Sequence, residues 1–246
     1  MARNPETDTK NLDLAGFYLK YDEIEAPGKP VYCTETGNPT TGFNDPTLWM
    51  PRISEAAAGK YALRTALEYF RVGIKRTFFH ELVDEHSDPH RSESNFGMLR
   101  NDWTPKPEFI GISNMNAILK DPGRSFRTGK LDYDMSGPEV SAGRVHHLLL
   151  QKRNGTFYLV LWHAVPSYDP DRKVDLSPAD AEVSIDFHGR VRAVRTFRPL
   201  DEALSSTPSA DRVLRVSGPL SIGAPDQPLI LELNTGGRSA RVRMPG

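Results

Sequence analysis

The sequence predicts an α+β composite fold, with β/α units in the first half of the chain and an antiparallel β-sandwich in the second. Three observations lead to this prediction. Helical periodicity alternates with short apolar runs before about residue 120, and strand-length runs broken by Pro, Gly, Asn and Asp follow after about residue 130. The turn signal Asp121-Pro122-Gly123 separates the two textures. We therefore expect one domain in residues 1–122 and a second in residues 123–246.

Length and composition agree with a globular protein that has a substantial core. The chain has 246 residues, of which 38% are hydrophobic and 26% charged, and these values exclude a fully disordered protein. The net charge is −1 and no polybasic block stands out, so we expect neither a nucleic acid nor an anionic membrane as partner. No run approaches 18 apolar residues, so no transmembrane helix is predicted.

The first residues and the single cysteine give little information about the cellular compartment. The start MARNPETDTKNLD lacks the apolar region of a secretory signal. Cys33 is the only cysteine, so it cannot form an internal disulfide. The localisation is therefore left open at this stage.

The first half reads as helix, strand, helix, strand, helix. The expected elements are a short helix over 12–25, a strand over 31–35, a helix over 55–71, a strand over 74–82 and a helix over 108–119. Ser54 can cap the central helix at its start, and Gly73 is suited to the left-handed residue at its end. Because this helix lies between two apolar runs, the two strands should be adjacent and parallel, joined by a right-handed crossover.

The second half reads as all β. The expected strands are 129–136, 144–152, 156–163, 181–186, 191–197, 212–216, 219–222 and 229–233. Asn154-Gly155 favours a tight hairpin turn. Alternation on either side of this turn predicts one shared inward face, made of Leu148, Leu150, Phe157, Leu159 and Leu161. Trp162 is expected in the core, and His146 and His147 are expected to be structural.

Glu35 is the first candidate for chemistry, because it ends a predicted parallel strand. Catalytic groups of β/α barrels lie at the carboxyl ends of strands. An unpaired buried carboxylate costs several kcal/mol or shifts its pKa, so such a residue needs a role or a partner. The spacing leaves two interpretations open: Glu35 acts in a site, or it caps the next segment or pairs with a nearby arginine.

Several motifs, in order, resemble the clan A glycoside hydrolases, which are retaining β/α-barrel enzymes of a family 39 or family 5 type. Val31–Gly37, preceded by Gly28-Lys29-Pro30, resembles their seventh strand, and Arg76–Leu82 resembles the eighth. Phe96–Leu99 with Thr104–Pro107 resembles the approach to the last helix, and Leu148–Trp162 is similar to an appended β-sandwich. The resemblance spans residues 27 to 235. It implies a partial (β/α)8 barrel, consisting of the last two β/α units, followed by an antiparallel β-sandwich.

The resemblance also implies a mechanism and a missing part. Glu35 matches the nucleophile that forms a glycosyl-enzyme, and a second carboxyl would protonate the leaving group. In this clan that second glutamate follows an asparagine on the fourth strand, but the sequence contains no Asn-Glu dipeptide. The 34 residues before Glu35 also cannot hold six strands. We therefore expect a truncated protein, for which a separately supplied N-terminal barrel part is a candidate partner.

Four further residues are expected to bind substrate. His80 and Glu81 lie near the end of the second strand, although Glu81 could instead pair with Arg76 or Arg100. Trp49 and Trp103 lie in the loops after the two strands, where each could stack on a sugar ring or pack against its own loop.

No metal or cofactor is expected, because the loop histidines that follow the second strand lack metal-ligand spacing. The sequence thus predicts a glycoside hydrolase-like protein with a carbohydrate substrate. The alternative is a non-catalytic remnant that binds carbohydrate or a partner. Full-length relatives of this kind are often secreted.

Overall fold

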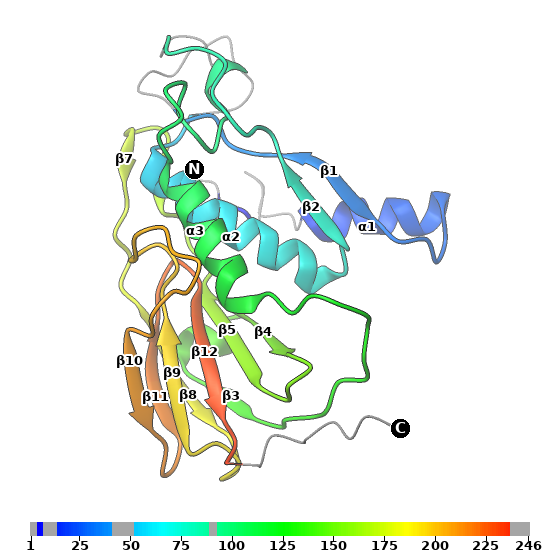
Figure 1. The fold of residues 1–246 in the computed structure, drawn as a ribbon, viewed down its shortest axis with the longest axis vertical. Helices are drawn as coiled ribbons and strands as arrows, with labels where there is room; N and C mark the ends of the chain where they lie inside the picture. Colours follow the sequence, from blue (N-terminus) through cyan, green and yellow to red (C-terminus); the bar gives the residue numbers. More distant parts are fainter. Residues whose placement is uncertain (1–3, 7–13, 41–51, 89–92, 237–246) are drawn as a thin grey trace.

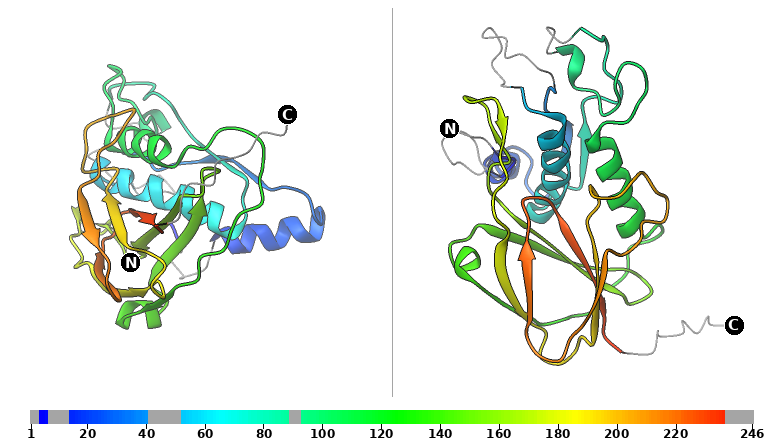
Figure 2. Two further views of the ribbon diagram at one scale, coloured as in Figure 1. Left: turned by 60° about the horizontal axis from the view of Figure 1, so that its bottom comes forward. Right: turned by 90° about the vertical axis from the view of Figure 1, so that its left-hand side faces the viewer.

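The chain folds into three layers, seen in a computed structural model that describes residues 4–6, 14–40, 52–88 and 93–236 (Figure 1). Helices α2 (Glu55–Val72) and α3 (Pro107–Leu119) cover one face of a five-stranded sheet. The other face of that sheet packs on a three-stranded sheet, and the side view separates these layers (Figure 2). No helix among the described residues has the length and hydropathy needed to cross a membrane.

Both sheets of the sandwich are antiparallel, as predicted. The larger sheet has the order β10-β9-β12-β5-β4 and the smaller one the order β11-β8-β3. The strands are β3 (Asp134–Ser136), β4 (Val145–Gln151), β5 (Phe157–His163), β8 (Ala181–Asp186), β9 (Ala193–Phe197), β10 (Arg212–Arg215), β11 (Leu220–Ala224) and β12 (Leu229–Asn234).

The boundaries differ from the prediction mainly at one strand. Of the strand expected over 129–136, only the last three residues form a strand, β3. The short helix α4 (Pro138–Ser141) and the small hairpin of β6 (Tyr168–Asp169) and β7 (Val174–Asp175) were not predicted. Elements of two to four residues carry too little periodicity to be recognised in a sequence.

The first half contains the predicted parallel strand pair. Strand β1 (Tyr32–Thr36) runs parallel to β2 (Arg76–Phe79), with Tyr32 opposite Arg76 and Cys33 opposite Thr77. The strand expected over 74–82 is thus shorter than predicted. Whether the pair belongs to a barrel stays a prediction.

The helix between the two strands has the predicted ends. The Ser54 hydroxyl accepts a hydrogen bond from the amide of Ala57 at 3.0 Å, and Gly73 takes the left-handed conformation with φ of 110°. Two smaller helical elements complete this half. Helix α1 (Leu14–Glu25) projects away from the rest of the molecule in Figures 1 and 2, and a 3₁₀ turn covers Glu93–Asn95.

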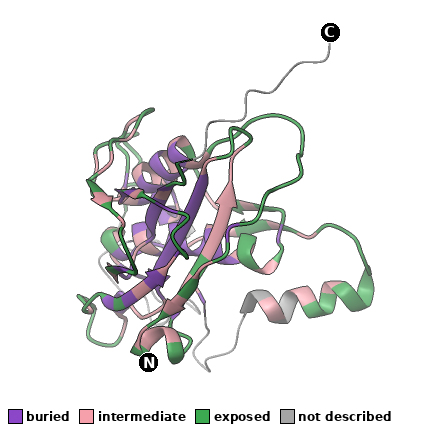
Figure 3. Cartoon of the chain, turned by 90° about the horizontal axis from the view of Figure 1, so that it is seen from below, coloured by how far each residue is buried: buried purple, intermediate pink, exposed green. Residues whose placement is uncertain are grey.

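The predicted inward face of β4 is wrong by one residue. Phe157, Leu159 and Leu161 do face the second sheet, but Leu148 and Leu150 pack under the helices, and Leu149 takes the inward position. The register explains this arrangement, because Leu149 lies opposite Leu159 while Leu148 lies opposite Val160. Strand β5 is buried along its whole length (Figure 3), because both faces of the sheet are covered. The alternation of apolar residues in the neighbouring β4 therefore does not reveal which of its faces points toward the second sheet.

The two predicted domains share a hydrophobic cluster. Leu63 and Leu67 of α2 pack with Val160, Trp162 and other residues of the five-stranded sheet. Trp162 is fully buried, as expected. The division at residue 122 stays a prediction, and this cluster crosses it.

A buried charged group strengthens the same junction. The Arg64 guanidinium of α2 donates to Glu6 Oε1 at 2.8 Å and to the Val165 carbonyl at 2.8 Å. The Trp162 indole donates to the same Glu6 oxygen at 2.9 Å. Three distant segments therefore meet at one ion pair whose side chains have almost no solvent exposure.

Candidate functional site at the carboxyl ends of β1 and β2

The ends of the two parallel strands are held tightly side by side. The amide of His80 donates to the carbonyl of Thr36 at 2.8 Å. A Cβ atom on Gly37 would lie 2.3 Å from the His80 carbonyl oxygen, so only glycine permits this approach. Glu35, which immediately precedes Thr36, is thereby placed at the same edge of the sheet as His80 and Glu81.

Glu35 lies at the carboxyl end of β1 and is exposed. Its carboxylate makes no hydrogen bond or ion pair with another residue of the described ranges. The capping and arginine-pairing interpretations therefore gain no support within those ranges. An exposed carboxylate at a strand end is free to contact a ligand that approaches this edge.

Glu81 is fixed by its backbone and has a perturbed carboxyl group. Its amide donates to the carbonyl of Phe96 at 3.1 Å, and its carbonyl accepts from the amide of Met98 at 2.9 Å. One carboxylate oxygen, Oε1, is buried without a hydrogen-bond partner among the described residues. Burial raises the pKa of Glu81, and the nearby His80 opposes this rise.

The two arginines that were the alternative partners of Glu81 do not pair with it. Arg100 instead binds Glu55, with 3.0 Å between Nε and Oε1, and no ion pair joins Arg76 to Glu81. His80 packs its ring against Phe96, with the ring centroids 5.5 Å apart.

A buried polar cluster lies beneath these loops, and the sequence analysis did not identify it. The Lys106 ammonium donates to Asp84 Oδ1 and to the Thr40 hydroxyl, each at 2.7 Å. Asp84 also accepts the amide of Gly97 at 2.8 Å. Burial raises the pKa of Asp84, although the hydrogen bond from Lys106 lowers it. The cluster ties the loop after β2 to the segment after β1 and thus supports the candidate site.

Glu108, in the first turn of α3, has the largest pKa shift among the carboxyl groups of this region. Burial raises its pKa to about 8, against the opposing effect of Lys106. Its Oε1 atom has no hydrogen-bond partner among the described residues. The only sequence signal for this cluster is a lysine between Pro105 and Pro107, and that pattern alone does not indicate burial.

Trp103 and Trp49 are the two tryptophans for which stacking on a sugar is predicted. Trp103 is 68% exposed and lies in a tight turn in which its amide donates to the Arg100 carbonyl at 2.8 Å. Trp49 lies outside the described residues. Within those residues no group of three His, Cys, Asp or Glu side chains could hold a metal ion.

No protein-family model matches the sequence, and no curated protein sequence matches it. A likeness does exist among solved structures. The fold is similar to a family 39 glycoside hydrolase from the gut symbiont Bacteroides cellulosilyticus WH2, with a TM-score of 0.62 and 16% identity. The match covers 94% of this chain and 42% of that one. The likeness concerns the fold, and the chain spans less than half of its neighbour's length.

Proposed function

We propose that this chain is the C-terminal part of a retaining glycoside hydrolase-like protein and that Glu35 is its nucleophile. The observation that carries the proposal is the position of Glu35, exposed at the carboxyl end of one of two parallel strands. In the complete protein the carboxylate would attack the anomeric carbon of a carbohydrate substrate and form a glycosyl-enzyme. The fold-level likeness to a family 39 glycoside hydrolase supports the same class of substrate.

His80, Glu81 and Trp103 would contribute to substrate binding around the nucleophile. His80 and Glu81 follow the neighbouring strand at the same edge, and the exposed Trp103 ring offers an aromatic face to the apolar side of a sugar. Trp49 is proposed for the same role on its position in the sequence. The acid/base carboxyl is expected to come from outside this chain, because the Asn-Glu motif that carries it is missing.

Aryl glycosides test this proposal. A dinitrophenyl leaving group needs little protonation, so a chain that lacks the general acid should still release dinitrophenol at a low, measurable rate. Natural glycosides need the acid, and this chain should hydrolyse them roughly 10²–10⁴-fold less efficiently than a complete site does. Glu35→Gln should abolish the release of dinitrophenol. Asp132→Asn, which changes an exposed carboxylate outside the candidate site, is the control and should leave the release unchanged.

Two results would contradict the nucleophile assignment. One is release of dinitrophenol that is equal in the wild type and in Glu35→Gln. The other is the absence of any release, which would favour the alternative function, a remnant that binds carbohydrate or a partner. Calorimetric titration with oligosaccharides would then test that alternative directly.

A further inference from the structure

The stretch between α3 and β3 concentrates positive charge. Residues 120–130 read KDPGRSFRTGK, and we call them the basic segment. Four of these eleven positions are Lys or Arg and one is Asp, which leaves an excess of three positive charges in a chain whose net charge is −1. Every residue of the basic segment is exposed. A ligand can therefore reach its cationic side chains from the solvent.

Both ends of the basic segment are tied to the hairpin that joins β4 to β5. The Arg153 guanidinium donates to the Asp121 carbonyl at 2.8 Å, and the amide of Gly129 donates to Gln151 Oε1 at 2.6 Å. Between these ties, residues 122–128 make no hydrogen bond to another described residue. The segment arches out from the body of the molecule on its way from α3 to β3, as Figures 1 and 2 show.

The cations of this arch have no acidic partner among the described residues. Arg124, Arg127 and Lys130 form no ion pair or side-chain hydrogen bond there, whereas Asp121, the acid of the basic segment, is bound by Arg153. The three cations recur at every third residue, so successive ones are at most about 11 Å apart along the chain. A guanidinium can bind a carboxylate through two parallel hydrogen bonds. The arch thus suits a ligand that carries carboxylates at intervals along its length.

Groups suited to a sugar accompany these charges. Phe126 lies between the two arginines and is 38% exposed, and such a ring can stack on the apolar face of a sugar. A cavity of about 310 Å³ lies where the basic segment meets the end of β4. Thr128 and Lys130 line it together with residues of β4, so a hydroxyl and an ammonium group can hydrogen-bond to a ligand there. Its volume is at the lower end of the range for small-ligand pockets.

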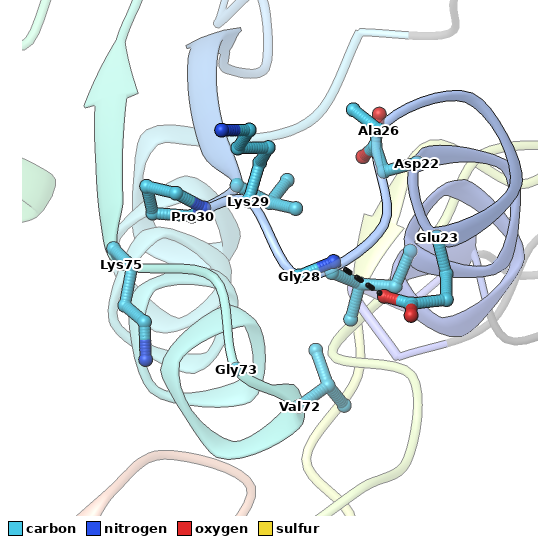
Figure 4. Close-up of a pocket in the computed structure, with 11 residues that line it drawn as sticks. Asp22, Glu23, Ala26, Gly28, Lys29, Pro30, Val72, Gly73 and Lys75 are labelled. Atoms are coloured by element: carbon cyan, nitrogen blue, oxygen red, sulfur yellow. Dashed lines mark hydrogen bonds between the residues drawn. The ribbon is translucent and has the colours of Figure 1, made fainter.

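A groove between α1 and the turn from α2 to β2 lacks this preference for one sign of charge. It is larger, about 480 Å³, but Asp22 and Glu23 lie on its helix side while Lys29 and Lys75 lie on its strand side (Figure 4). Two acids and two bases balance, so this groove favours neither anions nor cations. Its two lysines provide a matched comparison for the two arginines of the basic segment.

We propose that the basic segment binds an acidic oligosaccharide, whose uronate carboxylates pair with Arg124, Arg127 and Lys130 while one sugar ring stacks on Phe126. The choice of a carbohydrate rests on the proposed function, and the choice of an acidic one rests on the charges of the segment. This site is separate from the candidate site. Helix α3 begins directly after Lys106, beneath the candidate site, and its thirteen residues carry the chain about 20 Å to the basic segment. The site binds sugar without taking part in bond cleavage.

Titration calorimetry of the full chain tests this proposal. The acidic probes are hexasaccharides of galacturonate and of mannuronate and the hyaluronan hexasaccharide. Cellohexaose is the neutral probe, and hexaglutamate is a peptide that carries the same kind of carboxylate. We expect an acidic hexasaccharide to bind in about 50 mM NaCl and to bind more weakly in about 200 mM NaCl, because salt screens exposed ion pairs. Cellohexaose should not bind at the same protein concentration.

Three variants separate recognition by the basic segment from general electrostatics. Changing both Arg124→Gln and Arg127→Gln should weaken binding of the acidic hexasaccharide by about fivefold or more. Phe126→Ala should weaken it by about threefold or more, through the loss of stacking. The control changes both Lys29→Gln and Lys75→Gln, which removes the same net charge at exposed positions of the groove and should alter the affinity by less than about twofold. The melting temperatures of all variants verify that the fold is intact.

Each result of the titrations supports or overturns the proposal. The absence of binding by all three acidic hexasaccharides, or equal weakening by the arginine pair and the lysine pair, overturns it. Hexaglutamate that binds as tightly as the sugars, with no effect of Phe126→Ala, identifies an acidic polypeptide as the partner and also overturns it.

The same titrations with Glu35→Gln keep this proposal distinct from the proposed function. If no dinitrophenol is released but an acidic hexasaccharide binds through the arginine pair, the site on the basic segment stands and the nucleophile assignment fails. If release depends on Glu35 but no acidic hexasaccharide binds, the proposed function stands and the site on the basic segment fails.

Discussion

Glu68 couples the helical layer to the sheet through a single carboxylate. It lies on α2 and is 2% exposed, and it accepts from His146 Nδ1 on β4 at 2.8 Å and from Arg71 Nε at 2.9 Å. Burial alone would raise the pKa of this carboxyl, but the hydrogen bonds from His146 and Arg71 outweigh it and lower the pKa to about 2. His146 is therefore structural in the way that the sequence analysis expected.

The stability of the protein should consequently fall in acid through Glu68. Because the folded pKa lies below the ordinary value of 4.5, its contribution is complete above that value and is lost as the pH falls through about 2. The contribution is on the order of 3 kcal/mol, since each pKa unit corresponds to about 1.4 kcal/mol.

Urea unfolding of the wild type and of Glu68→Gln at pH 6 and pH 3 measures this effect. The variant should be less stable at pH 6 and should lose less stability between the two values. Glu182→Gln, at an exposed position of β8, is the control and should match the wild type. Parallel pH dependence in all three proteins would contradict the assignment.

At the level of elements, the close approach of Gly37, after β1, to the backbone of His80, after β2, limits which residue can occupy position 37. Gly37→Ala would place a Cβ against a backbone oxygen that no rotamer change can remove. We expect a loss of about 1–3 kcal/mol in the free energy of unfolding, as for other overpacked positions.

Gly218→Ala provides the matched control for this substitution. A Cβ at Gly218 meets no atom within 4 Å, so the free energy of unfolding should change by no more than about 0.5 kcal/mol. Denaturation curves that coincide for the two variants would show that the contact at Gly37 does not constrain the strand pair.

Some elements were predictable because their signals are local. Ser54 and Gly73 end α2 as predicted, since capping depends on a few neighbouring backbone groups. The parallel pairing also followed from the strand–helix–strand order. The inner face of β4 was not predictable, because the adjacent β5 is buried on both faces and only the tertiary register decides which leucine points inward.

The candidate site was predictable only in part, for a related reason. Glu35, His80 and Glu81 stand next to recognisable strand ends, so their common location follows from topology. The cluster of Lys106, Asp84 and Thr40 joins residues up to 66 positions apart, and no periodicity in the sequence indicates such contacts.

At the scale of the whole molecule, the two halves of the chain share a hydrophobic cluster. Residues 123–246 contribute Val160, Trp162 and Ile230 to a cluster that α2 and α3 cover. If residues 123–246 are expressed alone, these side chains lose that cover. The fragment should show a β-type circular dichroism spectrum, as the sandwich prediction requires, but it should also bind the dye ANS and self-associate.

Adding back the first segment tests the same junction. Residues 1–122 supplied in trans should reduce ANS binding by the fragment, and they should do so less well when Leu63→Asp disrupts the covering face. A fragment that stays monomeric and binds no ANS would show that the sandwich is an independent domain, as a boundary at residue 122 implies.

Glu108 has a consequence for the heat of folding. At pH 6.5 this carboxyl is ionised in the unfolded chain but protonated in the native protein, because its pKa rises from 4.5 to about 8. Folding at this pH therefore takes up a proton from the solvent. The contribution of Glu108 to the free energy of unfolding is present in full below pH 4.5 and is lost as the pH rises through 8. The buffer supplies that proton, so the calorimetric enthalpy of unfolding should differ between phosphate and imidazole by nearly the difference between the ionisation enthalpies of the two buffers. In Glu108→Gln that buffer dependence should disappear.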